Sequence, residues 1–199
     1  MHLIFNHPKI NNKKEEKGLS LIESAMVLAL AATVTAGVMF YYQSASDSNK
    51  TQAAISEVMS ATSAINGLYI GQTDYSGLGA KVLINSSAIP DNYKNTAHNK
   101  ITNPFGGDLD IAASSGNATA HYGYSLKLTA LPKSACVSLG TLNLGTSAAG
   151  YGINMNGTFS QFNNTAAKNQ AKSSAISPSE AANSCDDASN NNSVTFYMK

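Results

Sequence analysis

The stretch Lys17–Glu23, KGLSLIE, stands at a sharp change in composition. Before Gly18 lies a polar segment with four lysines, and after it comes a long apolar run in which Glu23 is the first charged residue. An ordinary secretory signal peptide has its apolar segment before the cleavage site and loses it on cleavage. A cut after Gly18 would instead leave the apolar segment at the start of the mature chain.

The apolar run is long enough to cross a membrane. No charged residue occurs from Ser24 to Ser46, and this run makes about 35 Å of helix, against a bilayer core of about 30 Å. We therefore expect residues 19–46 to anchor the chain. Glu23 needs a partner or an interfacial position, because a carboxylate costs about 2.5–3.5 kcal/mol at the bilayer centre.

The order of these features resembles the type IV prepilin signal, in which a dedicated peptidase cleaves after the glycine and N-methylates the new first residue. The resemblance implies a leader peptide over residues 1–18, cleavage after Gly18 and a mature chain beginning at Leu19. It also implies a role for Glu23 in assembly, by pairing with the Leu19 amine of a neighbouring subunit. The alternative is an interfacial glutamate at the edge of a simple membrane anchor.

A more specific resemblance rests on the stretch that starts at Lys17 together with six later segments. The later segments are AISEVMSATSAINGLYIGQ, IPDNYK, ITNPFGG, ACVSL, TLNLGTSA and VTFYMK. Together they resemble the type IVb pilins, and among these the major subunits of bundle-forming pili; a leucine as first mature residue points to the same branch. The resemblance implies an α+β type IV pilin fold, with a long N-terminal helix packed on an antiparallel β-sheet head and a disulfide-bounded C-terminal region.

The function implied by this resemblance is structural. Subunits would polymerise through the N-terminal helix into extracellular filaments that bundle, promote bacterial autoaggregation and adhere to host cells. The implied partners are further copies of the chain, prepilin peptidase, the pilus assembly machinery, the inner membrane before assembly, and the host-cell surface or neighbouring pili. A minor pilin or secretion-system pseudopilin remains an alternative, as does a membrane-anchored periplasmic binding protein or enzyme.

Composition argues against other functional classes. Without residues 1–18 the chain has nine lysines (13 minus 4) and ten carboxylates (12 minus 2). Nucleic acid is not expected as a ligand, because phosphate binding requires a basic surface. The sequence also lacks the motifs of serine hydrolases, zinc proteases, phosphate-binding loops and Cys-x-x-Cys redox sites. We therefore predict no enzyme, with no catalytic, cofactor-binding or metal-binding residues and no cofactor.

Residues 47–199 are expected to form one globular head that includes the second half of the long helix. Apolar residues there recur at alternating spacings of four and three, which is typical of one face of an amphipathic helix. This stripe, on which the head should pack, consists of Ala54, Val58, Ala61, Ile65 and Leu68. Gly67 and Gly71 indicate where the helix ends.

The remainder of the head reads as strands and short helices. Alternation of apolar and polar residues predicts a strand over residues 121–129, and Pro132 is suited to the first turn of a helix. Further strands are predicted at Gly150–Asn154 and Val194–Met198, the latter inside the sheet. The segment Ser177–Glu180 has the spacing of a capping box at the start of a short helix. The pairs Asp108/Asp110 and Asp186/Asp187 are interpreted as solvated loop charges.

Only two cysteines occur, Cys136 and Cys185. On an exported chain an even pair predicts a disulfide, whereas a metal site needs more ligands at short spacing. A bridge closing a loop of about fifty residues would contribute about 4 kcal/mol to stability. The alternative is a pair of buried free thiols.

Overall fold

The computed structural model of the protein describes residues 20–114, 121–155, 161–164 and 169–199. It divides into two units, one ending at Gln43 and one comprising Ser44–Lys199, the head. The helix α1 (Leu21–Leu68) contributes residues to both.

The described part of the first unit is helical from Leu21 onward. Its most apolar 18-residue window has a mean hydropathy of 1.8, and none of that window is buried. By length and composition this helix can cross a membrane, as the sequence predicts.

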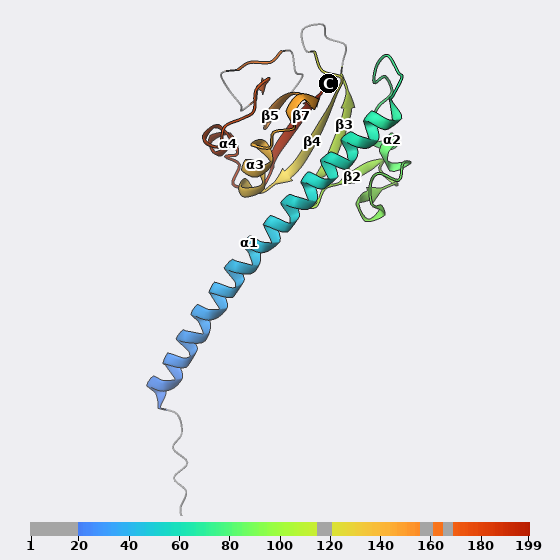
Figure 1. The fold of residues 1–199 in the computed structure, drawn as a ribbon. Helices are drawn as coiled ribbons and strands as arrows, with labels where there is room; N and C mark the ends of the chain where they lie inside the picture. The colour runs from blue at the N-terminus through green and yellow to red at the C-terminus, as the bar shows by residue number, and fades with distance from the viewer. Residues whose placement is uncertain (1–19, 115–120, 156–160, 165–168) are drawn as a thin grey trace, which may run out of the picture. The chain divides into compact units, whose positions relative to one another are not determined.

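The head is built on a seven-stranded sheet in which each pair of neighbouring named strands is antiparallel. The strands follow the spatial order β1 (Lys94–Asn95), β2 (Lys100–Thr102), β3 (Asp108–Ala113), β4 (Tyr124–Leu131), β7 (Asn192–Met198), β5 (Ala148–Ile153) and β6 (Ala171–Lys172). Figure 1 shows β7 between β4 and β5. The prediction that the strand over residues 194–198 lies inside an antiparallel sheet is therefore confirmed.

Short helices lie between the longer elements. They are α2 (Ala80–Ile84), the 3₁₀ turn η1 (Asp91–Tyr93), α3 (Lys133–Gly140), the 3₁₀ turn η2 (Gly145–Ser147) and α4 (Pro178–Ser184). Pro132 is the N-cap of α3, one position earlier than expected. The predicted capping box opens α4, with Ser177 and Glu180 bonded reciprocally.

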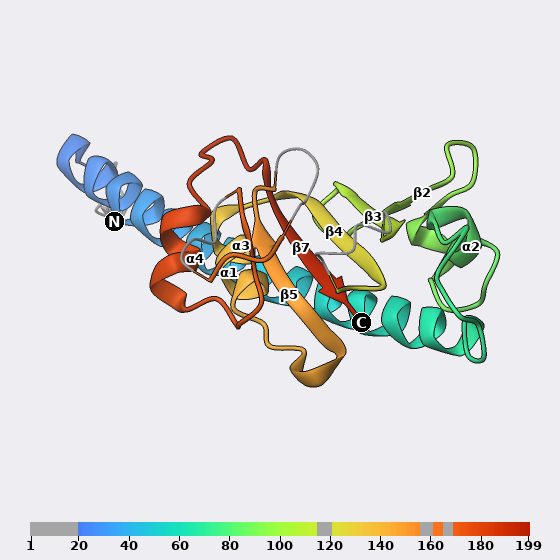
Figure 2. The same cartoon turned by 90° about the horizontal axis from the view of Figure 1, so that it is seen from above.

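The head packs on the apolar stripe of α1. Ala54, Val58, Ala61 and Ile65 are fully buried in the core, and Figure 2 shows the later part of α1 running along the sheet. Leu68 is 50% exposed, so its predicted place in the stripe is wrong. It is the last residue of the helix, where the chain turns away.

Two strand predictions need correction. The strand expected from His121 begins only at Tyr124. Asp108 and Asp110 lie in β3 rather than in a loop, with Leu109 and Ile111 between and after them pointing into the core. The alternation of carboxylates with apolar residues is itself the period of a half-buried strand.

Candidate functional site

The N-terminal end of α1 holds the residues expected to act in processing and assembly. Gly18 and Leu19 lie outside the described residues. Ser20 begins the described chain, and its hydroxyl oxygen accepts a hydrogen bond from the Ile22 amide (3.3 Å). In return, Oε2 of Glu23 accepts a hydrogen bond from the Ser20 amide (2.8 Å). The Ser-x-x-Glu spacing that gives this reciprocal cap is visible in the sequence, and it is the local signal for the start of α1.

The hydrogen bond to the Ser20 amide determines the position of the Glu23 carboxylate. The carboxylate is exposed in the first turn of α1, where the helix dipole favours a negative charge. Among the described residues, the Ser20 amide is its hydrogen-bond donor. Since a carboxylate accepts up to about four hydrogen bonds, capacity remains for an ammonium group from another chain.

The first half of α1 offers an apolar surface on all sides. Its large apolar side chains, from Leu21 to Tyr42, are between 59% and 86% exposed. The hydroxyls of Thr33 and Thr35 donate to the carbonyls of Leu30 (2.9 Å) and Ala31 (2.8 Å) within the helix. These polar groups are thus satisfied without water, which suits a lipid or helix-packed environment.

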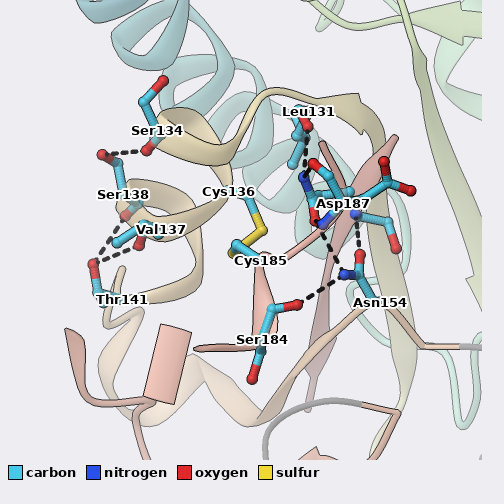
Figure 3. The surroundings of a disulfide bond; sticks show 12 residues. Leu131, Ser134, Cys136, Val137, Ser138, Thr141, Asn154, Ser184, Cys185 and Asp187 are labelled. Carbon is cyan, nitrogen blue, oxygen red and sulfur yellow. Dashed lines mark hydrogen bonds between the residues drawn. A yellow bond between two sulfur atoms is a disulfide. The ribbon is translucent and has the colours of Figure 1, made fainter. Parts of the chain in front are cut away.

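The C-terminal region of the head is bounded by the predicted disulfide. Cys136 on α3 and Cys185, directly after α4, are bonded, with their Cα atoms 5.9 Å apart (Figure 3). Both residues are buried in the core. The disulfide prediction is confirmed, and the alternative of two free thiols is wrong.

An ion pair fixes α4 on the edge of the sheet. Nζ of Lys172, on β6, donates to both carboxylate oxygens of Glu180, at 2.7 and 2.8 Å. This bond, together with the amide and hydroxyl of Ser177, lowers the pKa of Glu180 to about 2. The sequence predicted the cap made by Ser177, but nothing local indicated Lys172, which comes from a different element.

A long N-terminal helix, a head built on an antiparallel sheet and a disulfide-bounded C-terminal region are together the fold of a type IV pilin. A solved structure, the type IVb pilin from Salmonella typhi, shares this fold with a TM-score of 0.52. The match covers 74% of this chain and 99% of that pilin, at 18% sequence identity.

Sequence comparison is more specific. The major structural subunit of bundle-forming pilus from Escherichia coli O127:H6 (strain E2348/69 / EPEC) is 67% identical over 193 residues, covering 96% of this chain and 98% of the relative. The corresponding subunit from Escherichia coli O111:H- is 66% identical with the same coverage. The family model of bundlin matches residues 43–199. The chain belongs to the bundlin family, and the resemblance to type IVb pilins drawn from the sequence is confirmed.

Proposed function

We propose that this chain is the major structural subunit of a bundle-forming pilus and polymerises through the first half of α1 into filaments. The observation that carries the proposal is the apolar surface of α1 between Leu21 and Tyr42, which is exposed on all sides in the single chain. Exposed apolar area of this extent is removed from water only in a bilayer or against other helices. A subunit that moves from the membrane into a filament has this surface covered first by lipid and then by the helices of other subunits.

The proposed route starts with a precursor in the inner membrane. Prepilin peptidase removes residues 1–18 by cutting after Gly18 and methylates Leu19. Residues 19–46 then form the membrane-spanning and filament-core segment, and residues 47–199 the head. The division of the structure between Gln43 and Ser44 supports this partition.

In the filament, the Glu23 carboxylate pairs with the Leu19 amine of an adjacent subunit. The attraction is strengthened by the low dielectric of a helix bundle, but the desolvation of both charges offsets much of it. The pair therefore sets the register between subunits more than it adds stability. The assembled filaments bundle, aggregate the bacteria and adhere to host cells.

The substitution Glu23→Val tests this function. The variant should insert, lose its leader and form its disulfide, because the anchor becomes more apolar and Gly18 is unchanged. Surface filaments, imaged by electron microscopy with labelled antibody against the head, should be few or absent.

The matched control is Ser24→Val, the same replacement one residue later. Within the part of the chain that the structure describes, the Ser24 hydroxyl donates to the Leu21 carbonyl of its own helix (2.9 Å), so filaments should form. Abundant filaments made of Glu23→Val subunits would refute the pairing and leave Glu23 as an interfacial residue. Wild-type chain confined to short periplasmic structures would instead favour a pseudopilin.

A further inference from the structure

A buried asparagine completes its hydrogen bonding beside the disulfide. The side chain of Asn192 is fully buried. Its Nδ2 donates to the carbonyls of Leu131 (3.2 Å) and Asp187 (3.0 Å). Its Oδ1 accepts from the Asp187 amide (3.1 Å) and from Nδ2 of Asn154 (3.1 Å). An asparagine side chain has two donor hydrogens and two acceptor lone pairs, so all four are used.

Asn154 extends this cluster to α4. Its Nδ2 also donates to the Ser184 carbonyl (2.9 Å), and its Oδ1 accepts from the Ser193 amide (2.8 Å). Figure 3 shows Asn154 and Asp187 next to the disulfide, with dashed bonds reaching Ser184 and Leu131. Asn154 has a left-handed backbone (φ 51°), which asparagine tolerates better than most residues.

The segments held by the two asparagines are those that carry the cysteines. Ser184 directly precedes Cys185, and Asp187 follows it by two residues. Leu131 ends β4, and α3 with Cys136 begins two residues later. The cluster therefore contacts the chain on both sides of Cys185 and just before the helix of Cys136, through bonds that do not involve sulfur.

We propose that Asn192 and Asn154 are positioning residues for disulfide formation: they hold the Cys136 and Cys185 thiols together in the reduced head. In the reaction, a small-molecule disulfide such as oxidised glutathione accepts two electrons and becomes two thiols. The two cysteine thiols lose two protons and two electrons and form one S–S bond. Cys185, itself only 2% exposed, is one of the residues that line a surface hollow of about 630 Å³ between α3 and α4.

Positioning predicts a high effective concentration of one thiol at the other. Without the cluster, the residues around Cys185 lose their hydrogen bonds to β4 and to the chain after β5, and the connection between the two thiols becomes more flexible, while the Lys172–Glu180 ion pair still holds α4 at the sheet edge. Effective concentrations for flexible connections are in the millimolar range. Each variant of the cluster should therefore oxidise less favourably than the wild type.

The test measures the equilibrium of the full chain in detergent with mixtures of reduced and oxidised glutathione. Asn192→Ala should lower the oxidation equilibrium constant about tenfold or more, equivalent to a rise of about 30 mV in reduction potential. Asn154→Gly keeps the left-handed backbone and removes the side chain. It should lower the constant by a smaller factor, and it carries the test if Asn192→Ala does not fold.

Asn103 supplies a matched control at the other side of the sheet. It is 2% exposed, and its side chain makes four hydrogen bonds, to the carbonyls of Asp108 and Thr129 and from the amides of Phe105 and Gly107. Asn103→Ala should lower thermal stability while leaving the oxidation constant unchanged, under conditions where circular dichroism shows the reduced variant to be folded. An unchanged constant in both Asn192→Ala and Asn154→Gly would overturn the proposal. So would an equal fall in Asn103→Ala, because the effect would then be general destabilisation.

Discussion

A carboxylate buried in the core should make the head less stable as the pH rises. Glu57 lies on α1 beside the apolar stripe and is only 5% exposed. Neither of its carboxylate oxygens has a hydrogen-bond partner among the described residues. Burial disfavours the charged form and raises the pKa of Glu57 from 4.5 to about 7.

The sign and size follow from linkage. Between pH 4.5 and 7 the folded head keeps the Glu57 proton while the unfolded chain has lost it, so the free energy of unfolding falls as the pH rises through this window. At about 1.4 kcal/mol per pH unit, the loss is about 3 kcal/mol, complete above pH 7. Below pH 4.5 the carboxyl is neutral in both states and contributes no penalty.

Glu57→Gln removes the titration and keeps the shape. At pH 4 the variant compares two neutral side chains, so its stability difference from wild type reports only the buried amide. At pH 8 the wild type carries the full charge penalty, and the variant should gain about 3 kcal/mol relative to its difference at pH 4.

Urea unfolding of both chains in detergent, followed by circular dichroism at pH 4, 6 and 8, gives the stability difference between Glu57→Gln and the wild type at each pH. The change in that difference between pH 4 and pH 8 is the quantity predicted. Asp74→Asn, at an exposed carboxylate of the same head, is the control, because an exposed charge has little of the burial cost that Glu57 has. A Glu57→Gln difference of equal size at pH 4 and pH 8 would refute the reasoning and indicate that Glu57 is charged and solvated in the folded head.

Four further substitutions have definite expected outcomes. Gly18→Val should block cleavage, and mass spectrometry should find the chain in membranes with residues 1–18 attached; a mature chain starting at methylated Leu19 would contradict this. Cys136→Ser should lower the free energy of unfolding by about 4 kcal/mol and reduce the subunit level in cells. Wild-type levels and normal filaments in this variant would show that the bridge is dispensable. Gly107→Ala should destabilise the head by about 3 kcal/mol, because its Cβ would stand 2.1 Å from the Thr129 carbonyl oxygen. In Gly67→Ala the new Cβ would meet open space, so the free energy of unfolding, measured by thermal unfolding, should rise by up to about 1 kcal/mol. Equal effects at both glycines would argue against the steric cause.

The features that the sequence predicted correctly have local chemical signals. The stripe of α1 repeats over several helical turns, and the capping box of α4 lies within four residues. The bridge between Cys136 and Cys185 follows because only two cysteines are available. Each of these signals depends on few residues, so it can be recognised without knowing how the rest of the chain folds.

The features that were missed depend on partners distant in sequence or on very short elements. β1 and β2 contain two and three residues, too few to show a period. Lys172 finds Glu180 only because β6 and α4 are adjacent in space, and the four partners of Asn192 come from three separate segments. Glu57 is a carboxylate, so the sequence favours exposure, whereas the packing of the helix buries it.

The interior position of β7 has a consequence for how the head is made. Without residues 192–198 the sheet would fall into two parts, β1 to β4 and β5 with β6, because among the described residues β4 and β5 are joined through β7. Closing the gap requires contacts such as that from Asn192 to Leu131, across 61 residues of chain, and such non-local pairing is slow. Open strand edges are sites of aggregation. Once this seven-residue strand is in place, the facing edges of β4 and β5 are both paired, so its pairing removes two edges at which one newly made head could aggregate with another.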